Sequence, residues 1–315
     1  MAGSVRVRAY SSSANLGPGF DVLAVAHTAY YDEVEVRLEP GTGQVVVESV
    51  YGPYASQAGR ADTARRAVEE LLKITGTDVS NHDIVLRVYK GVPPGRGLGS
   101  SGASAAAAVK AVELLLDLNV SDSILVKAAG RGEAAAAGSP HYDNVAASLL
   151  GGLTIVSFDK DGQLYVSRIE VDAWFALFVP KIEIGSSKTK LMREILPRQV
   201  SLDIAARNWG RLAMLIAAAM RGDLRLMGHM MMQDEIVEPI RSRYIPCYDT
   251  VVEAALEAGA LGVTISGAGP ALIALASSRE DATRIAEAMT RSCKCCEIED
   301  VKIAQTAGPA TKVKW

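Results

Sequence analysis

The stretch from Pro93 to Ser104 holds the residue types best suited to binding a charged ligand. It places Gly95, Gly97 and Gly99 directly before two serines and an alanine-rich run. Glycines adopt positive φ at no steric cost, so they let a backbone wrap closely around a ligand. The run from Ser100 to Leu116 is almost entirely good helix formers, so the loop leads into a helix N-terminus, where free N–H groups and the positive dipole end bind anions. We therefore predict a phosphate site here, with a nucleotide as its ligand.

Two known phosphate-binding loops serve as comparisons. A P-loop of the G-x-x-x-x-G-K-[ST] type needs a lysine before its last residue, and this stretch has none. A G-x-G-x-x-G match exists at Gly97, Gly99 and Gly102, but the dinucleotide pattern begins directly after a strand. Here two prolines end the preceding strand, Ile84 to Tyr89, before the first of these glycines. The remaining alternative is a serine-capped glycine turn without a ligand, which the paired serines and the unbranched helix start disfavour.

Two further segments contain glycine-rich turns. The segment Ser11–Asp21 offers the amide of Asn15 and the carboxylate of its last residue around a turn of two glycines and a proline. The segment Ile265–Leu272 is a second glycine-rich turn directly after a strand. Alone, the first of them is best explained as an ordinary turn.

The segment Ser139–Leu153 gathers His141, Asp143 and Asn144, and it follows a helix that bears Glu133. An imidazole, a carboxylate and an amide in one short segment are groups that bind polar substrates and move protons. For the histidine alone, the alternative is an ordinary loop residue.

Length and composition restrict the class of protein. The 315 residues suffice for one large domain or two ordinary ones, with 49% hydrophobic and 22% charged residues. A net charge of −3 gives no basic field for nucleic acid or an anionic membrane. No apolar stretch approaches the length of a membrane span, and the N-terminus lacks the apolar core of a signal peptide. We therefore expect a cytoplasmic protein.

The four cysteines are Cys247, Cys293, Cys295 and Cys296. Their spacing is not that of two C-x-x-C pairs in a zinc finger, and adjacent thiols are poor simultaneous ligands for one tetrahedral zinc ion. We expect reduced, structural thiols near the surface, with an occasional disulfide, and no metal site.

The motifs lie on a regular series of elements. We expect strands over Val5–Tyr10, Glu33–Leu38, Gln44–Val50, Ile84–Tyr89, Leu153–Phe158, Trp174–Val179, Gly262–Ser266, Leu272–Ser277 and Glu299–Gln305. We expect helices over Asp62–Thr75, Ser100–Leu116, Ser121–Ala137, Asp203–Met220, Leu224–Val237, Cys247–Ala258 and Glu280–Arg291. Their order predicts an α+β fold of two domains, residues 1–168 and 169–315, with the boundary near the turn at Asp159–Gly162.

In combination, these segments resemble the GHMP kinases. The matching segments are P-x-x-x-G-L-G-S-S-[AG]-A at Pro93–Ala103, the Gly-Ala-Gly-Pro turn at Ser266–Pro270, S-A-N-L-G-P-G-F-D at Ser13–Asp21, H-x-D-N-V-A…L-L-G-G at His141–Gly152, and E-P-x-R at Glu238–Arg241 followed by Pro246. Their forms are most similar to those of the members that phosphorylate homoserine. Several matches in the expected order along nearly the whole chain are far more specific than the glycine loop alone.

The resemblance implies a fold, an activity and partners. The fold would be an N-terminal nucleotide-binding domain like ribosomal protein S5 followed by a ferredoxin-like α/β domain, with ligands at their interface. The activity would be ATP- and Mg²⁺-dependent phosphorylation of the L-homoserine hydroxyl to O-phospho-L-homoserine, a step in threonine biosynthesis. We expect a homodimer that binds neither nucleic acid nor membrane.

The resemblance also implies site residues. The residues expected at the reacting groups are Asp143 and Asn144, with the role of the carboxylate left open. The residues expected to bind the amino-acid substrate are Asn15, Asp21, His141, Thr189, Arg193 and Arg241. The residues expected to hold the nucleotide are Lys90, Pro93, Gly95, Arg96, Gly97, Leu98, Gly99, Ser100, Ser101 and Gly102. Ser101 and Glu133 would bind Mg²⁺, since a hydroxyl and a carboxylate are the hard ligands it prefers.

Some features depart from the family pattern, and other functions stay open. Many such kinases carry an asparagine beside the adenine, whereas QAGRADTARRAVEEL has none, so Asp62 and Thr63 are only a loose assignment of the adenine pocket. The segment with Thr189 also differs in detail. The alternatives are a GHMP kinase for another small alcohol, such as shikimate or mevalonate, and a non-catalytic sensor of a nucleotide or amino acid.

Overall fold

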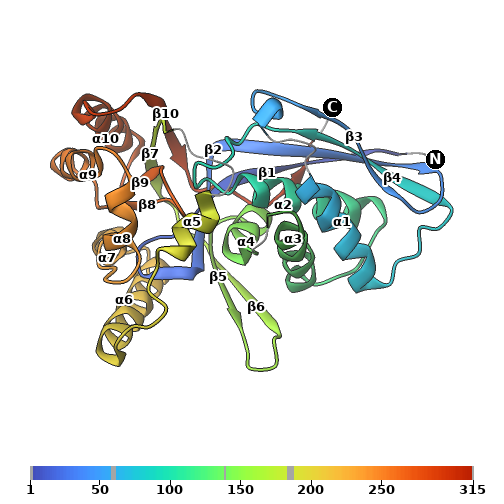
Figure 1. The fold of residues 1–315 in the computed structure, drawn as a ribbon, viewed down its shortest axis with the longest axis horizontal. Helices are drawn as coiled ribbons and strands as arrows, with labels where there is room; N and C mark the ends of the chain where they lie inside the picture. Colours follow the sequence, from blue (N-terminus) through green and yellow to red (C-terminus); the bar gives the residue numbers. More distant parts are fainter. Residues whose placement is uncertain (1–2, 58–61, 138–139, 183–187, 314–315) are drawn as a thin grey trace.

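The computed structural model describes residues 3–57, 62–137, 140–182 and 188–313, and it contains two β-sheets with helices packed against each (Figure 1). The larger sheet and helices α1–α4 form one part of the molecule, on the right of Figure 1. The smaller sheet and helices α6–α10 form the other part, and the hairpin of β5 and β6 projects between them. No helix among the described residues is long and apolar enough to cross a membrane.

The larger sheet is organised around one very long strand. Its strands are β1 (Val5–Asn15), β2 (Gly19–Pro40), β3 (Val45–Tyr51), β4 (His82–Tyr89), β5 (Leu153–Phe158), β6 (Leu164–Ile169) and β11 (Thr311–Lys312). Strand β2 pairs antiparallel with β1, with β4 through its second half and with β5 through Leu23–Val25. In β1, Val5, Val7 and Ala9 are buried, which is the alternation expected of a strand with one covered face.

Four helices cover that face. They are α1 (Asp62–Thr75), α2 (Ser100–Leu115), α3 (Asp122–Ala137) and α4 (Tyr142–Leu150). Helix α2 lies in the middle and packs against β1, β2 and the other three helices. Its buried residues are mostly alanine, and small side chains allow backbones to approach closely. The composition that predicts a helix here therefore also suits its central position.

The smaller sheet has helices on both faces. Its strands are β7 (Trp174–Pro180), β8 (Gly262–Ile265), β9 (Leu272–Ala276) and β10 (Ile298–Gln305), all antiparallel in the order β10-β7-β9-β8. The helices of this part are α5 (Lys188–Glu194), α6 (Leu202–Met220), α7 (Leu224–Met231), α8 (Glu238–Arg241), α9 (Tyr248–Glu257) and α10 (Arg279–Ser292). Phe175 shares a core with α6 and α7, whereas Phe178 shares one with α9 and α10, because successive side chains of a strand face opposite sides.

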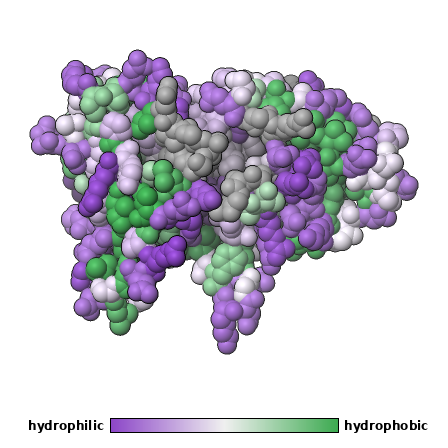
Figure 2. Space-filling model, in the orientation of Figure 1, coloured by the Kyte–Doolittle hydropathy of each residue, from purple (hydrophilic) through white to green (hydrophobic). Residues whose placement is uncertain are grey.

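The two parts share one core. The cluster that contains Phe175 also contains Leu16, Leu23 and Leu98 from the larger part. On the visible surface, Figure 2 shows hydrophobic residues around α5 and along α6, where Leu191 and Trp209 are exposed.

Several expectations about elements are wrong in detail. The strand expected at Glu33–Leu38 is the end of the longer β2, and the next strand, β3, does not pair with it but runs parallel to β4. The helix expected over Leu224–Val237 ends at Met231, because the carboxylate of Asp234 accepts hydrogen bonds from the N–H groups that follow it and closes a turn instead. The short elements α4, α5, β6 and β11 were not expected.

The expectation of mainly reduced thiols with an occasional disulfide holds for only two of the four cysteines. Cys247 and Cys295 form a disulfide, and Cys293 and Cys296 are free. The sequence separation of 48 residues between the bonded pair gave no signal, because only the packing of α9 against α10 brings the two segments together.

Candidate functional site

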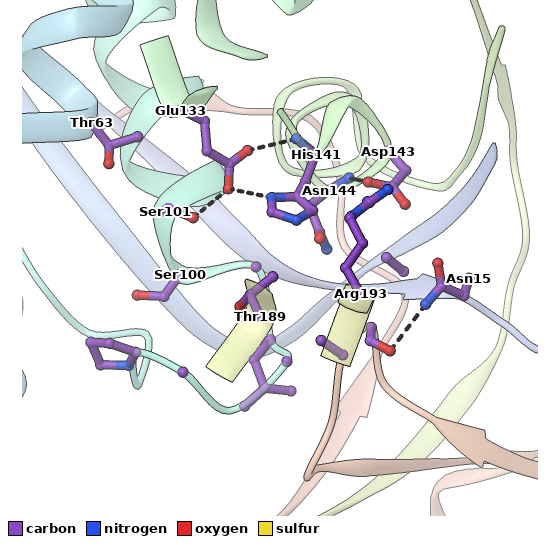
Figure 3. A pocket seen from close by; sticks show the side chains of 18 of the residues that line it. Asn15, Thr63, Ser100, Ser101, Glu133, His141, Asp143, Asn144, Thr189 and Arg193 are labelled. Carbon is purple, nitrogen blue, oxygen red and sulfur yellow. Dashed lines mark hydrogen bonds and ion pairs between the residues drawn. The ribbon is translucent and has the colours of Figure 1, made fainter. Parts of the chain in front are cut away.

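A cavity of about 770 Å³ opens where the two parts of the molecule meet. Its lining consists of Ala14, Asn15, Phe20, Asp21, Gln57, Asp62, Thr63, Lys90, Pro94, Gly95, Gly97, Leu98, Gly99, Ser100, Ser101, Ser104, Glu133, His141, Asp143, Asn144, Thr189, Lys190, Arg193, Arg241, Gly267 and Ala268. Residues from both parts contribute, so the packing of one part on the other creates the cavity. Figure 3 shows the polar side chains that face into it.

The glycine loop has the conformation that its sequence predicts. Gly95, Gly97 and Gly99 have φ of 70°, 80° and 67°, a region that other residues rarely adopt. Gly99 immediately precedes α2, whose first two serines line the cavity. The loop also packs tightly on the second glycine turn, since a Cβ on Gly97 would lie 2.1 Å from the carbonyl oxygen of Ser266. The first turn of α2 therefore presents its N–H groups to the cavity from a rigid support.

Lys90 supports this loop from beneath. Its buried ammonium forms an ion pair with Asp32 and donates hydrogen bonds to the hydroxyl groups of Ser100 at 2.9 Å and Ser104 at 2.8 Å. The other oxygen of Asp32 accepts bonds from the N–H groups of the two residues after the lysine. The lysine borders the cavity, but its charge is neutralised within the protein, so it orients the start of α2.

On the other side of α2, a hydroxyl, a carboxylate and an imidazole form a row (Figure 3). Ser101 donates a hydrogen bond to the buried carboxylate of Glu133, which also accepts bonds from the backbone N–H and Nδ1 of His141, both at 3.2 Å. Burial alone would lower the pKa of His141, but the hydrogen bond and charge of Glu133 outweigh it and raise this pKa. Ser101 and Glu133 offer oxygen ligands of the kind that Mg²⁺ prefers.

The start of α4 brings Asp143 and Asn144 to the same cavity. The amide Nδ2 of Asn144 donates to the Ser12 hydroxyl at 3.0 Å, which fixes it against β1. Asp143 is 3% exposed, and its Oδ1 accepts a bond from the N–H of Asn144 at 2.8 Å. Burial, reinforced by the negative charge of Asp21, raises the pKa of Asp143 to about 6. This carboxyl group therefore titrates near neutral pH, as an acid–base group would.

Arg193 and Asp21 form a two-bond ion pair across the cavity. Helix α5 carries the arginine and the start of β2 carries the aspartate, and the two N···O distances are 2.8 and 2.9 Å. The hydrogen bonds that Arg193 donates to Asp21 raise the pKa of Arg193. Both side chains are about four-tenths exposed, at 40% and 43%, so a ligand in the cavity can reach them.

Arg241 is the buried counterpart of Arg193. It is 4% exposed, and it donates to the carbonyl oxygens of Met192 at 3.2 Å and Gly267 at 3.0 Å. Burial lowers the pKa of Arg241 to about 10. The guanidinium carbons of both arginines lie over the ring of Phe20, at 5.3 Å for the buried and 5.4 Å for the exposed one. The two guanidinium groups therefore lie beside one ring at the same end of the cavity.

Asn15 connects the same turns. Its Nδ2 donates to Gly267, 3.0 Å away, and its Oδ1 accepts from the N–H of Asp21 at 3.3 Å. Asn15 itself has a positive φ of 74°, in the left-handed region that asparagine tolerates better than most residues.

Most of the residues predicted for the site meet at this cavity. All eight residues predicted at the substrate and the reacting groups line it, as do Glu133 and Ser101, and so do the loosely assigned Asp62 and Thr63. Three of the predicted nucleotide residues, Pro93, Arg96 and Gly102, are not among its lining residues.

Arg96 and Gly102 have other contacts. The guanidinium of Arg96 points to Glu299 of β10 at 2.5 Å and to the carbonyl oxygen of Ile182. A Cβ on Gly102 would touch Asn144 at 3.3 Å, so this glycine allows α2 and α4 to approach closely.

Sequence reasoning missed Phe20, Asp32 and Gly267 as functional residues. Phe20 and Gly267 lie inside recognised motifs, so the motif itself was the available signal. Asp32 lies in the middle of a strand and has no pattern around it. Only the pairing of β2 with β4 shows that it faces Lys90.

The chain matches known proteins along nearly its whole length. The model of the GHMP kinases N terminal domain matches residues 62–152, and that of the GHMP kinases C terminal matches residues 215–295. A homoserine kinase of Aeropyrum pernix is 54% identical over 98% of this chain and 97% of that protein. A crystal structure of homoserine kinase from Cytophaga hutchinsonii is 36% identical, with a TM-score of 0.88 over 98% of this chain and 97% of that one.

A more distant structure shares the fold alone. The mevalonate kinase of L. major has 20% identity and a TM-score of 0.72 over 98% of this chain and 97% of that one. The expected two-domain α+β fold is thereby confirmed. The glycine loop, Glu133, Arg193 and Arg241 all contribute to one cavity. With both domain models and a near full-length relative in agreement, the chain belongs to the GHMP kinase family.

Proposed function

We propose that this enzyme transfers a phosphoryl group from ATP to the hydroxyl of L-homoserine and forms O-phospho-L-homoserine. The observation that carries the proposal is the composition of the cavity's acceptor end, where Arg193 and Arg241 lie beside Asp21 and Asn15. A free amino acid presents a carboxylate and an ammonium group, and this end offers partners for both. The 54% identity to a homoserine kinase supports the same substrate.

The substrate would exchange partners with the protein's own ion pair. In the structure, Arg193 is paired with Asp21. The carboxylate of homoserine would take the place of Asp21 on the arginine, and its ammonium would bind the aspartate and the Oδ1 of Asn15. Each charge keeps an opposite partner, so the exchange leaves no charge unpaired. The buried Arg241 would add a second cation for the carboxylate, and Thr189 and His141 would complete the enclosure.

The glycine loop and the start of α2 would hold the triphosphate of ATP. Backbone N–H groups at a helix N-terminus bind phosphate oxygens, and the positive φ values keep side chains out of their way. The donor set of Ser101 and Glu133 fits Mg²⁺, which binds few protein oxygens and keeps phosphate oxygens and waters as its other ligands. When bound, the ion would supply positive charge to the transferred phosphoryl group.

Asp143 and Asn144 would face the acceptor hydroxyl. The amide is fixed by Ser12 and can orient that hydroxyl by a hydrogen bond. The carboxylate of Asp143, with its pKa of about 6, is mostly ionised at neutral pH and can accept the hydroxyl proton. A fall of kcat with this pKa, absent in Asp143→Asn, would support a role as base. A kcat that does not change with pH would indicate that the Asp143 carboxylate acts only through its charge.

A coupled assay of ADP release tests the substrate. L-Homoserine, shikimate and mevalonate are offered separately with ATP and Mg²⁺. We expect release with L-homoserine at a kcat/KM at least about a hundredfold above the other two, because neither of them carries an ammonium group for Asp21. Faster turnover of another alcohol would overturn the substrate assignment, and ATP binding without any turnover would indicate a sensor.

The organisation around this activity is also proposed. Residues 1–168 would bind the nucleotide and residues 169–315 would form the second domain, since the chain passes to the smaller sheet after β6. We propose a cytoplasmic homodimer whose product is used in threonine biosynthesis. Light scattering coupled to size-exclusion chromatography tests the oligomeric state, and a mass of one chain would contradict it.

A further inference from the structure

All four cysteines of the chain converge on one point, and none of them lines the kinase cavity. The sulfur of Cys293 lies 3.3 Å from that of Cys247 and 3.3 Å from that of Cys296, and Cys247 is bonded to Cys295. The point lies where α9 begins and the loop between α10 and β10 passes. Figure 1 shows these three elements on the left, in the part with the smaller sheet. A single disulfide uses only two of these groups. The convergence of the other two on the same point therefore needs a second explanation.

The sulfur atoms lie close enough together to form a tetrathiolate metal site once the disulfide is open. Zinc binds four thiolates at about 2.3 Å in a tetrahedron, which places the sulfur atoms about 3.8 Å from one another. The sulfurs of Cys247, Cys295 and Cys296 lie within 4.8 Å of one another, and the two contacts of Cys293 are 3.3 Å. Once the Cys247–Cys295 bond is open, movements within side-chain reach would complete the tetrahedron.

This geometry answers the objection raised by the sequence. Adjacent thiols are poor ligands for one ion when their side chains diverge, but the sulfurs of Cys295 and Cys296 lie within 4.8 Å of each other. Cys293 and Cys296 also have the C-x-x-C spacing common in zinc sites. The fourth ligand comes from another segment, 46 residues before Cys293, so a metal ion would join α9 to the loop after α10.

Two features favour negative charge on the sulfur of Cys247. The backbone N–H of Cys295 donates to the sulfur of Cys247 at 3.2 Å. Cys247 is the residue that precedes α9, a ten-residue helix whose positive dipole end stabilises a thiolate. Cys293 is buried, whereas Cys295 is exposed, so the cluster is closed on one side and open to an entering ion on the other.

We propose that these four cysteines bind one zinc ion when the disulfide is reduced. A dithiol reductant would donate two electrons and two protons to the Cys247–Cys295 bond and would itself become a disulfide. Four thiols would then lose their protons to solvent as Zn²⁺ binds. The bonded and the zinc-bound forms exclude each other, so metal content reports directly on the state of the cluster.

The test measures metal in the whole chain. The protein is reduced with a dithiol under inert gas, freed of reductant, given Zn²⁺ and dialysed, and its zinc is measured by mass spectrometry. We expect about one zinc per chain and four thiols shielded from a thiol reagent. Cobalt in place of zinc should give the strong near-ultraviolet absorption of thiolate ligands. Cys293→Ser and Cys296→Ser should each weaken binding by at least about tenfold, whereas Ser292→Ala should not.

Three results would overturn the proposal. The first is reduced protein that retains no zinc while its four thiols stay reactive. The second is rapid formation of a second disulfide, Cys293–Cys296, in the presence of Zn²⁺, seen as the loss of four hydrogen atoms in the intact mass. The third is zinc that both serine variants retain, which would place the ion elsewhere. Kinase activity serves only as a folding control, since none of the four residues lines the cavity.

Discussion

The two ends of the cavity are built by different means. The phosphate end comes mainly from one continuous stretch, with glycine backbone, two hydroxyls and a buried Lys90–Asp32 pair beneath it. The acceptor end is assembled from side chains of four distant segments, and its charges, such as Arg193 and Asp21, are paired with each other. The first end is rigid before any ligand arrives, whereas the second must exchange its internal ion pair for the ligand's charges.

This difference predicts different consequences of substitution. A change at the phosphate end should affect stability or turnover, because the backbone at Gly97 and Gly99 is closely packed against other segments. A change at the exposed part of the acceptor end should mainly affect substrate affinity. The following variants test that contrast, beginning with the largest effect.

Glu133→Gln should reduce kcat by roughly 100- to 1,000-fold, the loss found when one charge-stabilising group is removed. The amide keeps the size of the carboxylate but loses the negative charge that Ser101 and His141 contact. Steady-state kinetics over a range of Mg²⁺ concentrations measures the effect. Glu257→Gln, an exposed change at the end of α9, is the control and should be silent. A folded Glu133→Gln enzyme with an unaltered kcat would contradict the assignment.

Gly97→Ala and Gly95→Ala form a matched pair at the phosphate end. Both glycines have positive φ, so both variants carry a backbone strain of about 1–2 kcal/mol. The new Cβ of the first would lie 2.1 Å from Ser266 O, whereas that of the second meets no atom within 4 Å. We expect Gly97→Ala to melt at a clearly lower temperature and Gly95→Ala to stay folded but bind an ATP analogue more weakly.

Thermal melting and calorimetric titration separate the two effects. Equal melting temperatures for Gly97→Ala and Gly95→Ala would show that the loop is not packed on the second glycine turn. Unchanged affinity in Gly95→Ala would show that the loop is only scaffold, and the proposal for ATP would lose its main support.

The sequence predicts those parts of the two cavity ends whose residues follow one another along the chain. The phosphate end could be predicted, because glycines, serines and helix formers follow one another in Pro93–Ser104. The ion pair that supports this end could not be predicted, because Asp32 and Lys90 meet only through the pairing of β2 with β4. Strand register is a long-range property that neither segment carries alone.

The acceptor end could be predicted only through the resemblance to the family. Arg193 and Arg241 have no local signal that separates them from solvated surface arginines. The structure separates them, because Arg241 is buried whereas the side chain of Arg193 is partly exposed at the cavity. Helix α4 was missed because its first turn is polar and its hydrophobic run is short. The pairing of Cys247 with Cys295 could not be predicted, because the sequence does not show that α9 and α10 are neighbours.

Arg193→Ala and Arg241→Ala should each raise the KM for homoserine by about 30-fold, equivalent to about 2 kcal/mol, and leave the KM for ATP unchanged. Arg241→Ala should also lower the melting temperature, since it leaves the buried carbonyl groups of Met192 and Gly267 without this donor. Arg193→Ala should melt like the parent enzyme. The control Arg207→Ala removes an exposed ion pair with Glu235 and should alter neither value.

The KM values and melting temperatures of these two variants test whether the acceptor end differs from the phosphate end. If neither substitution raises the KM for homoserine several-fold, the substrate assignment is wrong. If both lower the melting temperature equally, the acceptor end is as rigid as the phosphate end.

The smallest effect concerns Asp143. Its pKa in the folded chain is about 6, above the ordinary value of 3.8, chiefly because of burial and then because of Asp21. The folded state therefore binds this proton more tightly than the unfolded state. Ionisation of the group costs stability above about pH 6, and the cost disappears as the pH falls through 6 towards 4. Asp143→Asn should thus stabilise the fold by about 1–2 kcal/mol near neutral pH, below the limit of about 3 kcal/mol set by the shift, and have little effect near pH 4. The amide oxygen can still accept the bond from the N–H of Asn144. Urea unfolding at the two pH values measures this difference. An identical stability change at both pH values would show that the pKa of this carboxyl group is not perturbed.

Asp21→Asn provides the sharper comparison, because removing that charge should lower the pKa of Asp143 and narrow the range of pH over which stability changes. Such a result would show that the carboxylates of Asp21 and Asp143 repel each other in the folded chain, and the ammonium group of the substrate would relieve this repulsion.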